Sequence, residues 1–529
     1  MNKNLFKTQH FPVTDTVNHA GGIAYSMRAK EALAQLVMTG TFNDTFYSSA
    51  SNLLDEVIKI LDSKKVNPEF VAKLAIMARE QGFMKDSPAL LTAWLSKNAP
   101  EYLEPVFNRV IDSGKMLRNF VQVMRSGVVG RKSLGTKSKK IVQQWLNKVS
   151  DYQLLMASVG KSPSLSDVIK MVHPKADSAE RNVFFKWILG IELSGEEVLM
   201  LPKNVIDLKM FQSGLNVETP KVPFELLTNL PLTKKHWIDI AKNASWHMTR
   251  MNLNTFTRNG VFENSEGVNL DMVKMIANRL SNPDLIDTTK VFPYQIFTTW
   301  MYAGGDVHPL ISDALHKAII HCTNKIPQMN KNIWIFVDVS GSMRSPITGQ
   351  QKGGTSKIRC VDVAALITSC YLKSNPENTH VIMFDTSIHQ ADLNPNNIFQ
   401  NSSFIAKFGG GGTACHLPLE YLNKIKASGD LLIYISDNES WFGQDHVYGF
   451  SRTFNDRTKT SKEWETFKRR NPHAKLVCID LTPNTTTQVQ TDKNILNVGG
   501  FSDQVFTIID GFVNKEKDHW IKTIENVKL

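Results

Sequence analysis

The sequence has few cysteines and no long apolar run, and each absence limits what the protein can be. Five cysteines are scattered along 529 residues, and none stands in a C-x-x-C pair. Such a set is a poor disulfide framework and a poor structural zinc site. No run approaches the roughly 18 apolar residues that span a bilayer. The first residues, MNKNLFKTQHF, lack the apolar core and cleavage site of a secretory signal. We therefore expect reduced, core-packed cysteines and a cytoplasmic protein without a membrane partner.

Acidic residues are scarce in one part of the chain. The formal net charge is +11, and residues 1–330 hold 39 Lys and Arg against 30 Asp and Glu. Residues 109–148 alone hold ten basic residues and one acid, Asp112. So concentrated a basic charge favours a polyanion such as nucleic acid as partner, or an anionic membrane surface. The sequence also lacks a G-x-x-x-x-G-K-[ST] loop, which excludes the usual nucleotide-binding turn.

Up to about residue 325 the apolar residues follow helical spacing. Ser87-Pro88 is typical of a helix start, and Leu91, Trp94 and Leu95 then form one apolar face. Asn269 similarly precedes a helix-like pattern at 270–280. Amphipathic helices joined by short polar connections predict an all-helical array, with a curved solenoid as one arrangement. No clean sequence period accompanies the pattern.

Near residue 330 the pattern changes. Residues 334–337 form a continuous apolar run, as in a strand buried on both faces. Further strands are expected at 380–384, 431–435 and 476–481, with helices between them, among others at 356–373 and 460–470. Strands that alternate with helices indicate an α/β doubly wound, mostly parallel sheet. We therefore predict two domains, residues 1–328 and 329–529.

Oxygen-bearing side chains follow the strands of the second domain. The first strand leads into a D-x-S-x-S loop, a glycine run precedes a threonine, and a later strand ends in an aspartate. The five residues are Asp338, Ser340, Ser342, Thr413 and Asp437. Carboxyl ends of parallel strands share one edge of a sheet, and hard oxygen ligands suit Mg²⁺. The pattern resembles the metal-ion-dependent adhesion site (MIDAS) of von Willebrand A domains, where a partner carboxylate completes the metal shell. The alternative is that the two serines only cap the next helix.

The basic region mixes cations with glycine and serine between residues 125 and 140, and a second cluster follows in IKMVHPK. Small residues let a backbone approach phosphates, while cations replace condensed counterions. The candidate RNA-binding residues are Arg125, Arg131, Lys132, Lys137, Lys139, Lys140, Lys170, His173 and Lys175. A lysine run is usually a solvated helix face, but the scarcity of acids here favours a binding surface.

Several stretches resemble the Ro ribonucleoprotein family and its helical TROVE module. They are NHAGGIAY (18–25), LAIMAREQGFMKDSPALLTAWL (74–95), VVGRKSLGTKSKKIVQQW (128–145), SDVIKMVHPK (166–175), MTRMNLNTFTRNGVF (248–262) and VFPYQIFTTWMYAGG (291–305). The D-x-S-G-S domain follows in the order typical of that family. The resemblance implies a multidomain fold, an all-α HEAT-like helical-repeat ring (TROVE) plus a von Willebrand A-like domain, in a bacterial or phage member of the family.

The resemblance also implies a function without catalysis. Single-stranded 3′ ends of misfolded or immature non-coding RNAs would enter the ring, and duplex parts or a Y-like small RNA would bind the outer basic surface. Gly130-Arg131 and His173 match residues of that surface. The implied partners are such RNAs and an exoribonuclease, for a monomer in RNA quality control or maturation. Two alternatives stay open: a protein-interaction scaffold that acts through the metal, and a nuclease using Asp338 and Asp437. Two-metal cleavage needs more converging carboxylates than these two.

Overall fold

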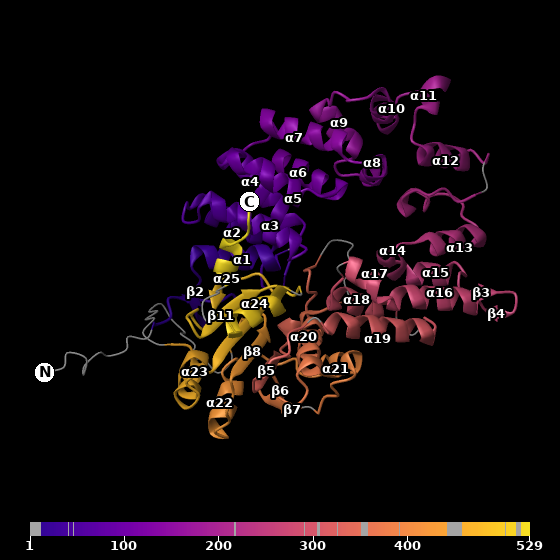
Figure 1. Cartoon of the computed structure of the whole chain (residues 1–529). Coiled ribbons are helices and arrows are strands. Elements are labelled where there is room, and N and C mark those ends of the chain that lie inside the picture. The colour runs from indigo at the N-terminus through magenta and orange to yellow at the C-terminus, as the bar shows by residue number, and fades with distance from the viewer. Residues whose placement is uncertain are drawn as a thin grey trace. The chain divides into compact units, whose positions relative to one another are not determined.

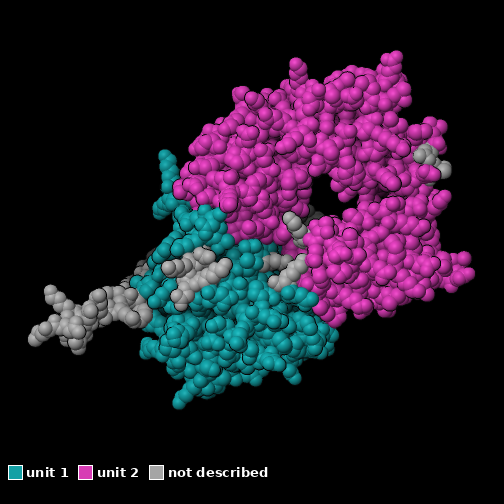
Figure 2. Space-filling model, in the orientation of Figure 1, with its two compact units in different colours: residues 1–66, 323–526 teal, residues 67–322, 527–529 magenta. Residues whose placement is uncertain are grey.

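The computed structural model describes residues 12–40, 42–45, 47–215, 218–289, 291–303, 307–324, 326–350, 358–390, 392–441, 457–502, 504–514 and 520–529. The chain forms two compact units, coloured separately in Figure 2. Unit 1 comprises residues 1–66 and 323–526, and unit 2 comprises residues 67–322 and 527–529. The break at 322/323 lies close to the predicted boundary at 328/329. Residues 1–66, which the prediction assigned to the helical domain, group with unit 1 instead.

Unit 1 is built on a six-stranded sheet. From edge to edge its strands are β11 Ile495–Gly499, β9 Lys475–Asp480, β8 Leu431–Ser436, β5 Ile333–Asp338, β6 Thr379–Phe384 and β7 Ile388–Gln390. All neighbours are parallel except the β6–β7 pair. Every residue of the central strand β8 is buried, which explains its unbroken apolar sequence.

Helices cover both faces of this sheet. The helices α22 Leu417–Lys424 and α23 Lys459–Arg470 bury Leu419 and Phe467 against Phe336 and Tyr434 of the strands. Helix α20 Cys360–Ser374 packs on β5, β6 and β8, and its residues do not belong to the apolar cluster formed by α22, α23 and the strands. Helix α24 Gln504–Asn514 contacts β11. The unit also contains α21 Ile398–Ile405 and α25 Trp520–Glu525. The doubly wound arrangement expected from the sequence is present.

The first described residues, 12–66, form what we call the N-terminal segment, and they complete unit 1. It contains β1 Thr16–Val17, β2 Ile23–Ser26, α1 Ala29–Thr39 and α2 Ala50–Asp62. Strand β2 lies between β1 and β10 Thr486–Thr487 in a small antiparallel sheet. Helix α1 packs on β11, where Gln35 Nε2 donates a 2.7 Å hydrogen bond to Asp480 Oδ2. These pairings explain why the segment does not belong to the helical unit.

Unit 2 is a succession of helices that follows a curved path (Figure 1). In chain order they are α3 Pro68–Glu80, α4 Asp86–Asn98, α5 Leu103–Val110, α6 Gly114–Ser126, α7 Gly135–Lys148, α8 Asp151–Ser158, α9 Leu165–Val172, α10 Ala179–Ile188, α11 Gly195–Leu199, α12 Lys203–Gln212, α13 Lys234–Asn243, α14 Trp246–Met251, α15 Leu253–Arg258, α16 Leu270–Ser281, α17 Pro283–Thr289, α18 Pro293–Ala303 and α19 Pro309–Thr323. A two-stranded hairpin, β3 Glu263–Asn264 and β4 Gly267–Val268, precedes α16. Apart from this hairpin, the expected helical array is present.

Two predicted helix starts have different outcomes. Asn269 caps α16 as predicted, since its side chain accepts a hydrogen bond from the Met272 amide at 3.3 Å. The prediction for Ser87 is wrong, because α4 already begins at Asp86 and no side chain caps it. Residues 87–96 are all buried, since α3, α5 and α6 pack around α4. The spacing that suggested one apolar face therefore belongs to a helix that is enclosed.

All five cysteines are buried, as expected for core-packed side chains. Within the described ranges, no helix is both long and apolar enough to cross a membrane.

Candidate metal centre and nucleic-acid interface

The D-x-S-x-S loop begins at the carboxyl end of β5. Asp338 is fully buried, and its Oδ1 accepts a 2.8 Å hydrogen bond from the Ser340 amide. Ser436 Oγ donates to Asp338 Oδ2 at 2.6 Å, and the Ser340 and Ser342 hydroxyl oxygens lie 3.3 Å apart. The short 3-10 helix η4 Ser342–Arg344 has no side-chain cap. The serines therefore do not have the capping role that was the alternative interpretation.

The glycine run brings Thr413 to this loop. The Gly341 amide donates to Gly411 O at 2.9 Å, and the Gly410 amide donates to Val339 O at 3.0 Å. A Cβ at Gly409, where φ is +76°, would lie 1.9 Å from Val339 O, so only glycine fits there. Thr413 O in turn accepts a hydrogen bond of 3.1 Å from the amide of Trp441, which stands four residues after Asp437 in the sequence. All five predicted metal-site residues are therefore brought to one edge of the sheet, where each is buried.

Two carboxylates are buried at this edge of the sheet. Burial raises the pKa of Asp338 to about 6, against hydrogen bonds from Ser340 and Ser436 that lower it. Burial, and then the charge of Asp338, raise the pKa of Asp437 well above its usual value. A divalent cation would offset this repulsion, and two carboxylates with three hydroxyls form a hard oxygen set of the kind Mg²⁺ accepts. The residues fit such an ion, and its binding stays a prediction.

The part of the chain that the structure describes has no group of three or more His, Cys, Asp or Glu residues placed to hold one metal ion. A metal at the sheet edge would therefore depend on the serine and threonine hydroxyls as well as on Asp338 and Asp437.

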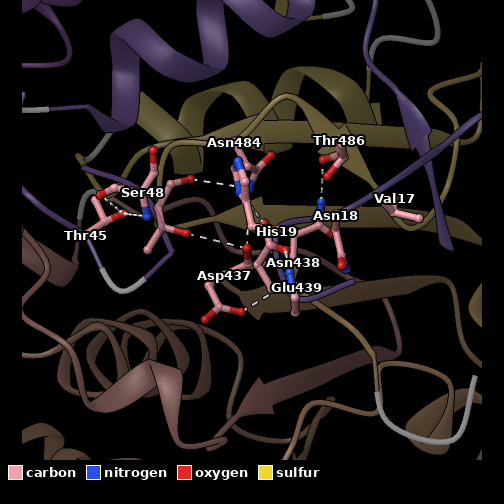
Figure 3. A network of polar contacts seen from close by, with 12 residues as sticks. Val17, Asn18, His19, Thr45, Ser48, Asp437, Asn438, Glu439, Asn484 and Thr486 are labelled. Atoms are coloured by element: carbon pink, nitrogen blue, oxygen red, sulfur yellow. Dashed lines mark hydrogen bonds and ion pairs between the residues drawn. The ribbon is translucent and has the colours of Figure 1, made fainter. Parts of the chain in front are cut away.

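The N-terminal segment contacts the loop that carries Asp437, which sequence reasoning missed. His19 Nδ1 lies 3.1 Å from Glu439 Oε1 (Figure 3). The Ala20 amide donates to Glu439 Oε2 at 3.2 Å. Asn18 Nδ2 donates to Ser440 O at 2.9 Å. A Cβ at Gly22 would lie 2.1 Å from the same carbonyl oxygen, so the turn needs glycine. The NHAGG motif was the available signal, but it carried no information about what it contacts.

The His19–Glu439 pair makes a pH-dependent contribution to stability. Hydrogen bonds to Glu439 and then Glu56 raise the pKa of His19 to about 10. Because the folded pKa lies above the unfolded value of about 6.5, the stabilisation is complete below that value and is lost as pH rises through the folded pKa. We expect His19→Gln to lower the Tm by about 2–5 °C at pH 6.5 and by much less at pH 10. Thermal melts across this pH range measure the difference.

The matched control for that substitution is His473→Gln, since His473 is exposed. It should change the Tm little at any pH. A His19→Gln effect that stayed constant from pH 6.5 to pH 10 would show that the pair contributes by packing and not by charge.

The nine predicted RNA-binding residues, which we call the basic surface, come from α6, α7, α9 and their connections. All are exposed except Arg131, which is half-buried. Gln143 Nε2 on α7 donates to Val172 O at 2.6 Å, and Asn147 Nδ2 donates to Lys175 O at 2.8 Å. These bonds hold the turn after α9 against α7. The two clusters, some thirty residues apart in sequence, therefore lie on neighbouring elements.

The carboxylate of Asp167 interacts with one cation of α6 and one of α9, so these two helices lie close to each other. The charges of Lys170 and Arg125 both lower the pKa of Asp167, after the larger effect of its hydrogen bonds with Ser164. Those bonds, from the Ser164 amide at 2.9 Å and hydroxyl at 2.7 Å, commit the carboxylate to capping α9. The basic surface therefore keeps an excess of positive charge. Whether it binds RNA stays a prediction.

One further cation lies at this surface. Lys97, near the end of α4, is exposed, and its Nζ would lie 2.2 Å from a Cβ at Gly130, where φ is +74°. The glycine therefore leaves room for the lysine over the turn between α6 and α7. Lys97 was missed because it stands more than thirty residues before that turn.

Comparisons with known proteins agree with these features. Residues 332–513 match the family model of the Ro60 von Willebrand A domain. The chain is 22% identical over 476 residues to the RNA-binding protein RO60 of Deinococcus radiodurans, covering 84% of this chain and 87% of that protein. It is 21% identical over 252 residues to the RNA-binding protein RO60 of Caenorhabditis elegans, covering 46% of this chain and 36% of that protein.

A solved structure shares the fold. The crystal structure of the Deinococcus radiodurans Ro (RSR) protein matches with a TM-score of 0.60 at 18% identity, covering 92% of this chain and all of that one. The predicted resemblance to Ro proteins is therefore confirmed. The predicted fold class is confirmed too, as a helical-repeat part with a von Willebrand A domain.

Proposed function

We propose that this chain is an RNA-binding protein of the Ro type. The observation that carries the proposal is the basic surface, on which cations from α6, α7 and α9 gather on neighbouring elements. Exposed lysines and arginines that displace counterions supply most of the affinity for a nucleic acid backbone. The relatives from Deinococcus radiodurans and Caenorhabditis elegans that are named RNA-binding proteins support it.

The RNAs we assign are non-coding RNAs with a structured body and a single-stranded 3′ end, either misfolded or immature, and a Y-like small RNA. The basic surface would hold duplex parts by their phosphates. Unit 2 also contains a cavity of about 490 Å³ lined by Tyr152, Met156 and Met251, all of which are exposed. Unpaired bases stack on such aromatic and apolar side chains without regard to sequence. Figure 2 shows an opening in unit 2 that single strands could enter.

For the von Willebrand A domain we propose a Mg²⁺ site formed by Asp338, Ser340, Ser342, Thr413 and Asp437. When bound, the ion would offer an open coordination position to a carboxylate of a protein partner, for which we propose an exoribonuclease. We assign no catalytic step to this chain, which would act as a cytoplasmic monomer in RNA quality control or maturation. The second candidate, a metal-dependent scaffold without RNA, draws its support from the buried oxygen set alone.

The 3′ tail gives the first test. We expect a hairpin RNA with a single-stranded 3′ tail to bind about tenfold more tightly than the same hairpin without it, because base stacking adds about 1–3 kcal/mol per base. Both affinities should fall steeply with salt, since phosphate contacts dominate. Gel-shift titrations at several salt concentrations measure both effects.

A hairpin with the same tail at its 5′ end is the control for that titration. Equal affinity for all three RNAs would contradict the proposed binding site for single strands, but it would leave the proposal that the basic surface binds RNA. No binding at low salt by a folded protein would overturn the RNA function and leave the scaffold as the better account.

A further inference from the structure

We propose that the N-terminal segment is part of the metal centre, with Tyr47 as the residue that positions the ligand Ser342. This inference rests on the proposed Mg²⁺ site and is independent of RNA binding. The segment lies outside the matched domain of residues 332–513. Its loops nevertheless reach the metal-site edge at two places, one beside Ser342 and one beside Asp437.

The first place is the connection between α1 and α2. Asn43 Nδ2 donates to Thr348 O at 2.6 Å, and the Gln350 amide donates to Asp44 O at 2.6 Å. A Cβ at Gly349, where φ is +71°, would lie 2.8 Å from Asp44 O, so the two loops approach closely. These contacts anchor the connection to residues just beyond the D-x-S-x-S loop. Tyr47 is carried by the same connection, and its hydroxyl is hydrogen-bonded to Ser342.

Two hydrogen bonds hold the Ser342 side chain. It is hydrogen-bonded to the Asp437 carboxyl group as well as to Tyr47. Ser342 belongs to the loop after β5, Asp437 follows β8, and Tyr47 belongs to the N-terminal segment. The two bonds restrict the rotation of the Ser342 hydroxyl, which orients its oxygen for a cation.

The second place is the loop after β8, which the N-terminal turn and β10 hold from two sides. Asn438, with φ at +61°, donates from Nδ2 to Thr486 O at 3.0 Å. Asn484 Nδ2 donates to Asp437 O at 3.3 Å, as Figure 3 shows. Strand β10 is itself paired with β2. Together with the bonds from Asn18, His19 and Ala20, these contacts fix the backbone that carries the second carboxylate.

The test is a Mg²⁺ titration of the full chain, followed by the rise in Tm and by calorimetry. We expect Tyr47→Phe to need about tenfold more Mg²⁺ than the wild type for the half-maximal rise in Tm. The reason is that loss of a group that orients a ligand costs about 10–100-fold in metal affinity. Its Tm without metal should stay within about 2 °C of the wild type, since an exposed or half-buried hydroxyl contributes little to stability. A merely structural role would lower that metal-free Tm and leave the Mg²⁺ dependence unchanged.

The matched control is Tyr25→Phe in the same segment. Tyr25 is fully buried, and its hydroxyl oxygen has no hydrogen-bond partner among the described residues. The control should bind Mg²⁺ like the wild type. Wild-type Mg²⁺ affinity in Tyr47→Phe would overturn the inference while leaving the metal site. A wild type that does not respond to Mg²⁺ would overturn both, and hairpin binding by the same preparations would still report separately on the RNA function.

Discussion

Reversing four cations of the basic surface together is expected to weaken RNA binding by about a hundredfold or more at moderate salt, because each lost phosphate contact also removes its counterion release. The four substitutions are Lys139→Glu, Lys140→Glu, Lys170→Glu and Lys175→Glu. All four lysines are exposed, so the fold should be retained. Each phosphate contact contributes about 0.9 to the slope of log affinity against log salt. Loss of four contacts should therefore make this slope shallower by about 3–4. Gel-shift titration of the tailed hairpin over a salt series measures affinity and slope.

A variant with the same change in net charge elsewhere on unit 2 is the control. It carries Lys203→Glu, Lys235→Glu, Lys242→Glu and Lys274→Glu, at lysines that are also exposed. We expect its affinity to fall by no more than about threefold, through the weaker long-range field alone. An equal loss in both variants would show that RNA responds to overall charge, with no localised surface.

Four of the metal-site residues, Asp338, Ser340, Ser342 and Asp437, could be predicted from the sequence because they follow recognisable strands. The unbroken apolar runs that end at Asp338 and before Asp437 mark strands buried on both faces. Parallel pairing then brings their carboxyl ends together without further information. The glycine run before Thr413 also has a local reason, since Gly409 has no room for a side chain.

The place of the N-terminal segment could not be predicted in the same way. Strands β1 and β10 have two residues each, which is too short for alternation to appear in the sequence. The pairing of β2 with β10 joins residues about 460 positions apart. Such contacts depend on the folded surface of the sheet and not on local propensity. His19 and Tyr47 were missed for this reason, although His19 stands in a motif that sequence analysis had singled out.

The basic surface shows an intermediate case. Its residues were recognised by composition, but their common placement rests on Gln143 and Asn147, which donate to backbone carbonyls after α9. No periodicity reveals a side chain that bonds to a distant carbonyl. The enclosed helix α4 differs from its prediction for a related reason, because the number of neighbours around a helix is a tertiary property.

The buried carboxylates of the metal centre oppose folding when no cation is bound. The folded pKa of Asp338 lies above its ordinary value of 3.8, so the folded protein binds a proton there more tightly than the unfolded chain does. Stability without metal therefore falls as pH rises from about 4 through about 6, and the loss corresponds to about 2–3 kcal/mol for a shift of about two units. A bound divalent cation would offset this loss by supplying positive charge between Asp338 and Asp437.

Asp338→Asn is therefore expected to have two opposite effects at pH 7.5. It should abolish the rise in Tm with Mg²⁺, and it should raise the Tm in EDTA by about 5 °C, because a neutral amide replaces one of two repelling charges. Melts at pH 5 and pH 7.5, in EDTA and in Mg²⁺, test both. The control Asp392→Asn changes an exposed aspartate of the same unit and should leave the Mg²⁺ response intact. A variant that is less stable than the wild type in EDTA at pH 7.5 would contradict the repulsion, because the hydrogen bonds from Ser340 and Ser436 would then outweigh it.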